Sequence, residues 1–138
     1  MSDTAVDTSD FRMLHTMIRV KDLEKSKAFY TDFLGMKIMR ESENEVGKYS
    51  ICFVGYGDEE KDCVVELTYN WGQDEPYDLG TGFGHLAIAA PDVYATCAAL
   101  EKAGLNIPRP AGPVKGGTRV IAFIEDPDGY KIELVQRD

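Results

Sequence analysis

Two stretches of the sequence decide the fold, and they repeat one another: HTMIRVKDLEKSKAFYTDFLG at 15–35 and HLAIAAPDVYATCAALEKAG at 85–104. Each stretch opens on a histidine, runs through a short apolar strand to an aspartate, and then shows helical spacing up to a glycine. Asp22 and Asp92 stand where a helix N-cap accepts from free first-turn amides. The closing glycines stand where a chain turns through positive φ after a helix. The chain therefore contains one supersecondary module twice.

Three strand-like runs follow each helix. We expect them at 36–40, 49–55 and 63–68 in the first copy and at 106–108, 119–125 and 131–135 in the second. Each module is then β-α-β-β-β, and the fold class is α+β. The turn GYGDEEKD at 55–62 is replaced in the second copy by the tighter DPDG, where Asp126 and Asp128 are interpreted as turn formers. One open four-stranded sheet with a single helix cannot cover both of its faces, so two modules must pack together, within the chain or across a dimer.

The two modules are predicted to form one domain over 11–138, with the first module at 11–69 and the second at 84–138. Residues 70–83 lack periodicity and carry Gly and Pro, so they are predicted to be the linker. Residues 1–10, MSDTAVDTSD, are predicted to be a disordered lead-in. This lead-in has neither the basic n-region nor the apolar h-region of a secretory signal.

The composition argues against several classes of partner. The 24 acids outnumber the 15 bases and give a net charge of −9, whereas nucleic acids and anionic membranes need a basic surface. No apolar run approaches the ~20 residues of a membrane span. Cys52, Cys63 and Cys97 are odd in number and lack C-x-x-C spacing, which predicts reduced thiols and a cytoplasmic location. We interpret all three as small buried hydrophobes.

One histidine and one glutamate recur at the same places in both copies. His15 is followed by Glu66 in VVELTYN, and His85 by Glu133 in KIELVQR. An ionised glutamate within an apolar strand is costly unless it is paired or bound to a metal. Two imidazoles and two carboxylates suit Ni, Co, Zn, Mn or Fe. The alternative is a structural histidine and a solvent-facing glutamate, but the chain has only two histidines, both repeat-related, which favours a metal site.

Seven strings of the sequence resemble the glyoxalase I family of the vicinal-oxygen-chelate superfamily. They run from Met13 to Val135 and read LHTMIRV, FYTDFLGMK, FVGYG, ELTYNWG, GFGHLAI, GPVKGGT and AFIEDPDGYKIEL. The resemblance implies the glyoxalase fold, with paired βαβββ modules forming curved sheets that are domain-swapped across a homodimer. It also implies that each site takes two ligands from each chain, with His15 and Glu66 opposite His85 and Glu133 of the partner.

The same resemblance implies an activity. The substrate would be the hemithioacetal of glutathione and methylglyoxal, and the product S-lactoylglutathione. A divalent cation would stabilise the enediolate that forms when the carbon beside the carbonyl loses its proton. By resemblance Glu133 is the base that moves this proton, and Glu66 could act on the opposite enantiomeric face. Base catalysis by one positioned carboxylate contributes ~10²–10⁴-fold.

Substrate contacts follow from position and from the resemblance together. Arg19 lies four residues after His15, and Asn70 four after Glu66, so each shares a strand face with its ligand. Both match family positions that hold the γ-glutamyl end of glutathione. Lys115, in GPVKGGT, is the candidate for the glycyl carboxylate, although a solvated loop is the alternative there.

The sequence leaves alternatives open for the identity of the metal and for the reaction. An arginine of the human-type enzymes is replaced by Thr81, and His15 stands where those enzymes have glutamine. The compact chain resembles the bacterial class that Ni²⁺ or Co²⁺ activates, with Zn²⁺ as the alternative. Other readings are a dioxygenase or epimerase of the superfamily, a thiol transferase that inactivates an antibiotic, or a metal-free drug-binding protein.

Overall fold

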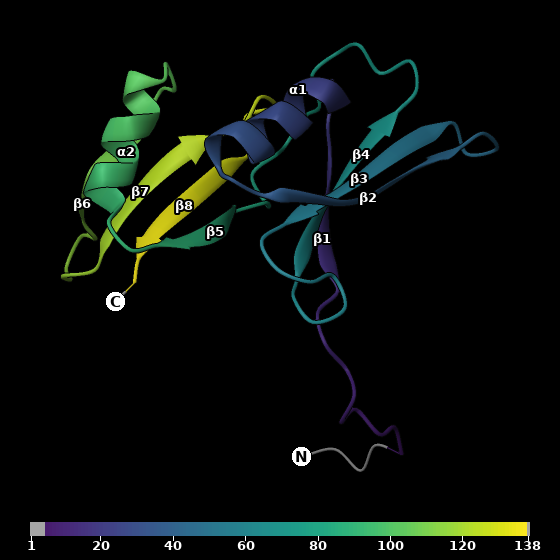
Figure 1. The fold of residues 1–138 in the computed structure, drawn as a ribbon, viewed down its shortest axis with the longest axis horizontal. Helices are drawn as coiled ribbons and strands as arrows, with labels where there is room; N and C mark the ends of the chain where they lie inside the picture. The colour runs from purple at the N-terminus through teal and green to yellow at the C-terminus, as the bar shows by residue number, and fades with distance from the viewer. Residues whose placement is uncertain (1–4, 138) are drawn as a thin grey trace.

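The repeat in the sequence is a repeat in the structure, a computed structural model that describes residues 5–137. The first sheet contains β1 (His15–Arg19), β2 (Lys37–Asn44), β3 (Tyr49–Gly55) and β4 (Val64–Asn70) in the order β1-β4-β3-β2. The second contains β5 (His85–Ala90), β6 (Arg109–Pro113), β7 (Val120–Glu125) and β8 (Lys131–Gln136) in the order β5-β8-β7-β6. In each sheet the first strand runs parallel to the last, and the other pairs are antiparallel. The predicted pair of βαβββ modules is confirmed (Figure 1).

One helical segment lies against each sheet and begins as expected. Asp22 accepts from Lys25 N at 3.1 Å to open α1 (Leu23–Ala28), and Asp92 accepts from Ala95 N at 3.1 Å to open α2 (Val93–Lys102). The closing glycines have φ of 70° and 99°. The first helix differs in one respect, because α1 continues into a π-helix, η1, at Phe29–Phe33.

The prediction of a strand at 106–108 is wrong, because these residues are irregular and β6 begins at Arg109. The segment NIPRPAGP contains prolines at 108, 110 and 113. Proline cannot donate to a ladder, so it is confined to edge strands and bulges. β6 is such an edge, and its pairing with β7 shifts register between Arg109 and Gly112. The strand therefore begins three residues later than predicted, but it still forms.

The hydrophobic core lies between each sheet and its helix. The largest fully buried side chains, which come from both modules, are Tyr30, Leu67, Ile124, Ile132 and Leu134. The opposite face of each sheet carries the histidines and glutamates and remains half-exposed. The prediction of a disordered lead-in falls partly on residues 1–4, which lie outside the described residues, and residues 5–10 are exposed coil and turn.

The two modules meet where η1 and the start of α1 contact the DPDG turn between β7 and β8. Tyr30 Oη donates to Asp126 Oδ2 at 2.7 Å, and Asp128 Oδ1 accepts from Lys21 N at 2.9 Å. Asp126 Oδ1 also accepts from the backbone amides of Asp128 and Tyr130, each at 2.9 Å. These aspartates therefore form the turn as predicted, and they also join the modules. Figure 1 shows α1 between the two sheets and α2 on the far side of the second sheet.

Candidate metal centre

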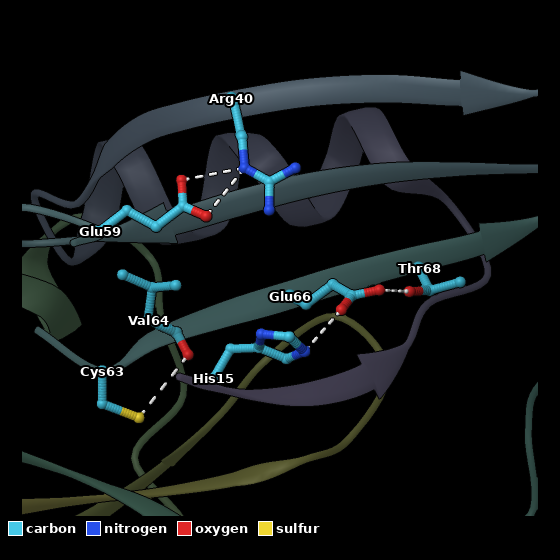
Figure 2. Close-up of polar contacts among 7 residues, drawn as sticks. All are labelled: His15, Arg40, Glu59, Cys63, Val64, Glu66 and Thr68. Carbon is cyan, nitrogen blue, oxygen red and sulfur yellow. Dashed lines mark hydrogen bonds and ion pairs between the residues drawn. The ribbon is translucent and has the colours of Figure 1, made fainter. Parts of the chain in front are cut away.

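The first half of the candidate site lies on two parallel neighbours, β1 and β4. His15 opens β1, and its Nε2 stands 2.9 Å from Oε1 of Glu66 on β4. The other oxygen of Glu66 accepts from Thr68 Oγ1 at 2.9 Å. Figure 2 shows this chain of contacts, from imidazole through carboxylate to hydroxyl, on one face of the sheet. The glutamate is thereby held at both oxygens.

The second half repeats this geometry on β5 and β8. His85 Nε2 stands 3.2 Å from Glu133 Oε1. Each glutamate pairs in register with the residue two after its histidine, which is Met17 in the first sheet and Ala87 in the second. One difference separates the halves. The position equivalent to Thr68 is Val135, and among the described residues Glu133 has no side-chain contact recorded other than that with His85.

An aromatic ring supports each histidine, and the sequence reasoning missed both rings. Phe53 lies edge-on to His15 with 5.3 Å between centroids, and Phe123 lies edge-on to His85 at 5.1 Å. Each phenylalanine is the register partner of its module's glutamate. Repeat alignment of CFVG with AFIE carried the signal, but phenylalanine is common in strands and its face becomes evident only from the register.

The two halves do not meet within one chain. Among residues 5–137, no group of three or more His, Cys, Asp and Glu side chains is placed to hold a metal ion. β1 and β5 are both edge strands, and they do not pair. Thr16 of β1 and residues 86–89 of β5 instead line a common cleft of about 620 Å³.

Each half has the right donors and spacing for part of a metal site. Two donors bound at about 2.1 Å to one divalent ion stand roughly 3 Å apart, and the histidine–glutamate separations are 2.9 Å and 3.2 Å. Imidazole and carboxylate suit Zn²⁺ and its first-row neighbours. The residues therefore fit a divalent ion, with two donors on each module.

Of the residues predicted to bind substrate, Arg19 and Asn70 lie on the first module and Lys115 on the second. Asn70 donates to Tyr77 Oη at 3.1 Å, and Arg19 and Tyr77 line one small pocket of about 220 Å³. Tyr77 of the linker thus lies near both Arg19 and Asn70, the two residues predicted to hold the γ-glutamyl end of glutathione. Lys115 lies on the second module, in the exposed turn after the outer strand β6. Thr81 is exposed within the linker.

The fold and these paired half-sites define a class of protein, and comparison with family models agrees. Residues 12–134 match the model described as the glyoxalase/bleomycin resistance protein/dioxygenase superfamily, and the chain belongs to this family. It is 60% identical over 128 residues to a probable lactoylglutathione lyase of Vibrio parahaemolyticus, covering 93% of this chain and 92% of that one. It is 58% identical over 125 residues to the lactoylglutathione lyase of Escherichia coli O157:H7, covering 91% and 92%.

Solved structures give the same result. Glyoxalase I from Zea mays superimposes with a TM-score of 0.87 at 51% identity; the match covers 91% of this chain but only 44% of the maize chain. The trypanothione-dependent glyoxalase I of Leishmania major superimposes with a TM-score of 0.82 at 43% identity, covering 92% and 87%. No helix in the described part of the chain is long and apolar enough to cross a membrane.

Proposed function

We propose that this chain is a glyoxalase I that isomerises the hemithioacetal of glutathione and methylglyoxal to S-lactoylglutathione. The observation that carries the proposal is the repeat-related histidine–glutamate pair on each module, at 2.9 Å and 3.2 Å. The name lactoylglutathione lyase on relatives at 58–60% identity, with more than nine tenths of both chains covered, supports the same reaction.

The proposed metal set is His15, Glu66, His85 and Glu133, assembled from two chains. Both histidines lie on edge strands, so an approach of β1 in one subunit to β5 in another would bring the two pairs together. Edge strands also favour association, because the backbone groups on their outer side have no neighbouring strand to pair with. The proposed assembly is therefore a homodimer with two shared sites.

The chemistry needs one acid–base group and stabilisation of negative charge. A divalent ion held by the four residues would supply Lewis-acid stabilisation of the negative charge that develops on the substrate. Glu133 removes the proton from the carbon that carries the sulfur and returns it to the neighbouring carbon, so no redox cofactor is consumed. Thr68 holds Glu66 at its second oxygen, whereas no residue of 5–137 holds Glu133 in this way, which favours Glu133 as the carboxylate that moves.

The remaining residues bind the substrate. Arg19 can grip a carboxylate with two parallel N–H groups, and together with Asn70 it is proposed to hold the γ-glutamyl end of glutathione. Lys115 is proposed to hold the glycyl carboxylate from the partner's side of the shared site. We place the enzyme in the cytoplasm, because Cys52, Cys63 and Cys97 are free thiols. The prediction that all three are buried is wrong for Cys63, which is exposed.

The preferred ion is proposed to be Ni²⁺ or Co²⁺, with Zn²⁺ as the alternative. The test is a spectrophotometric assay of hemithioacetal isomerisation on metal-stripped protein, with each of the three ions added back in turn. We expect activity to return with Ni²⁺ or Co²⁺, and absence of activity with every ion would refute the proposed function. Titration of the stripped protein with the same ions distinguishes a metal-free binding protein, which would take up none.

A further inference from the structure

A row of side chains crosses each sheet at the level of the candidate ligands. In register along the first sheet stand Arg40, Phe53 and Glu66, and along the second stand Arg109, Phe123 and Glu133. The histidine of each module lies edge-on to the phenylalanine of its row. Both modules therefore carry an arginine at the equivalent position, in addition to the histidine and glutamate of the candidate metal site.

The two arginines have different partners. Arg109 donates to backbone carbonyls of its own edge region, namely those of Pro110, Gly112, Pro113 and Ile121. Three of these carbonyls belong to the proline-containing edge strand β6, and that of Ile121 belongs to its neighbour β7. Arg40 instead places its guanidinium over the ring of Phe53, 4.0 Å from the centroid. Phe53 is only 4% exposed, so the ring is held between a cation and the imidazole of His15.

A glutamate from the longer turn of the first module holds Arg40 in this place. Arg40 Nε donates to both carboxylate oxygens of Glu59, at 3.0 Å and 2.8 Å, as Figure 2 shows. Arg12 anchors the turn by donating to the carbonyl of Glu59 at 3.1 Å. These residues and His15 surround one pocket of about 370 Å³. DPDG, the corresponding turn of the second module, is too short to supply an equivalent of Glu59.

We propose that Arg40, held by Glu59, is a positioning residue that fixes the His15 ring through Phe53 and so sets the metal affinity of the first half-site. The inference rests on the proposed metal function. His15 begins an edge strand and is one-third exposed, so its ring needs support from neighbours. Glu59 has a second effect, because its charge offsets the repulsion between a guanidinium and a nearby divalent ion. The orienting effect of Glu59 thus requires Arg40, whereas its charge acts on the ion directly, as any nearby carboxylate would.

Four variants of the full-length dimer test this dependence: Glu59→Gln, Arg40→Met, the double variant and Glu60→Gln. Residues that orient a metal ligand commonly change affinity by about 10–100-fold, so we expect Glu59→Gln to weaken Ni²⁺ or Co²⁺ binding at least tenfold. Arg40→Met should cause a smaller loss, because it removes the support and the repulsion together. The double variant should lose no more than Arg40→Met does, apart from the charge effect that Glu60→Gln measures. Glu60 lines the same pocket without pairing to Arg40, so Glu60→Gln controls for the loss of one negative charge.

Affinity is measured by competition with a chromogenic chelator, and the Co²⁺ absorption spectrum reports the ligand geometry independently of turnover. A shifted Co²⁺ band in Glu59→Gln but not in Glu60→Gln supports a positioning role. If the wild-type protein binds none of the ions, the proposed function and this inference both fail. If it binds them and Glu59→Gln and Arg40→Met bind as tightly as Glu60→Gln, this inference alone is overturned. Unfolding of Arg40→Met would not rescue it, because the comparison of Glu59→Gln with Glu60→Gln decides the outcome.

Discussion

Two glutamates that the repeat makes equivalent differ in their surroundings. Glu66 is tied at one oxygen by Thr68, and Glu133 has Val135 at that position. The proposed base would have to turn towards the substrate carbon, and a carboxylate held at one oxygen only is better suited to do so. This asymmetry is a physical reason to assign proton transfer to Glu133.

Replacing Glu133 with glutamine should separate metal binding from turnover. The amide keeps an oxygen donor and nearly the same shape but cannot accept the proton, so we expect kcat to fall by ~10²–10⁴-fold while metal remains measurable. The measurements are kcat from the isomerisation assay and metal content of the same preparation. Glu66→Gln is the matched comparison and should retain more turnover. A Glu133→Gln enzyme with wild-type kcat would refute the assignment.

Asp126 should leave a signature in the pH dependence of stability. Burial raises the pKa of its carboxyl from 3.8 to about 6, against the opposing effect of hydrogen bonds from Tyr30 and the backbone. The folded state then binds a proton more tightly than the unfolded state, so this group's contribution is fully present below pH 4 and is lost as pH rises through about 6. A shift of about two units corresponds to about 3 kcal/mol.

Asp126→Asn should remove this slope, because an amide has nearly the same shape as the carboxyl but does not titrate. Its oxygen can accept from the two backbone amides, and its nitrogen can donate to the Tyr30 oxygen. We expect the difference in unfolding free energy between wild type and variant to change across pH 4–6 and to be flat above pH 7, measured by urea unfolding. A constant difference over the whole range would contradict the assignment.

At the scale of elements, the sequence predicted the features that rest on periodic patterns or on rare residue types. The strand–helix–strand repeat and the two histidine–glutamate pairs could be found because aspartate caps, closing glycines and histidines are distinctive. The row formed by Phe53 and Arg40 could not be found from the sequence, because only the strand register shows which residues of neighbouring strands lie side by side. The start of β6 was misplaced because prolines obscure an edge strand. The π-helix η1 has no distinguishing pattern of its own.

The π-helical turn has a consequence for the junction between modules. It carries Tyr30, fully buried, whose hydroxyl donates to Asp126 at 2.7 Å. Tyr30→Phe would leave a buried carboxylate oxygen without its donor, which costs about 1–3 kcal/mol. We expect this loss in the free energy of unfolding at pH 7.5. Tyr56→Phe is the control, since its hydroxyl bonds the Leu34 carbonyl at 2.6 Å but the residue is half-exposed, and it should lose less.

At the scale of the whole molecule, the single chain leaves its functional faces incomplete. Each module presents two donors on a half-exposed sheet face, and in the described part of the chain the strand that carries the histidine has a neighbour on one side only. Just before β1, three large apolar side chains are exposed: Phe11 at 71%, Met13 at 70% and Leu14 at 55%. Exposed apolar groups clustered in this way favour association. In the proposed homodimer, a second copy of the chain would supply the other two proposed ligands and would cover these side chains.

Subunit complementation tests whether sites are shared. One chain carries His15→Ala and Glu66→Ala, and the other carries His85→Ala and Glu133→Ala, so neither homodimer has a complete set of ligands. If each site combines the first module of one chain with the second module of the other, the heterodimer contains one intact site and one empty of ligands. The heterodimer, purified through two different tags, should then show about half of the wild-type turnover per dimer. Sites formed within single chains would leave it inactive, because each chain lacks one half of the set.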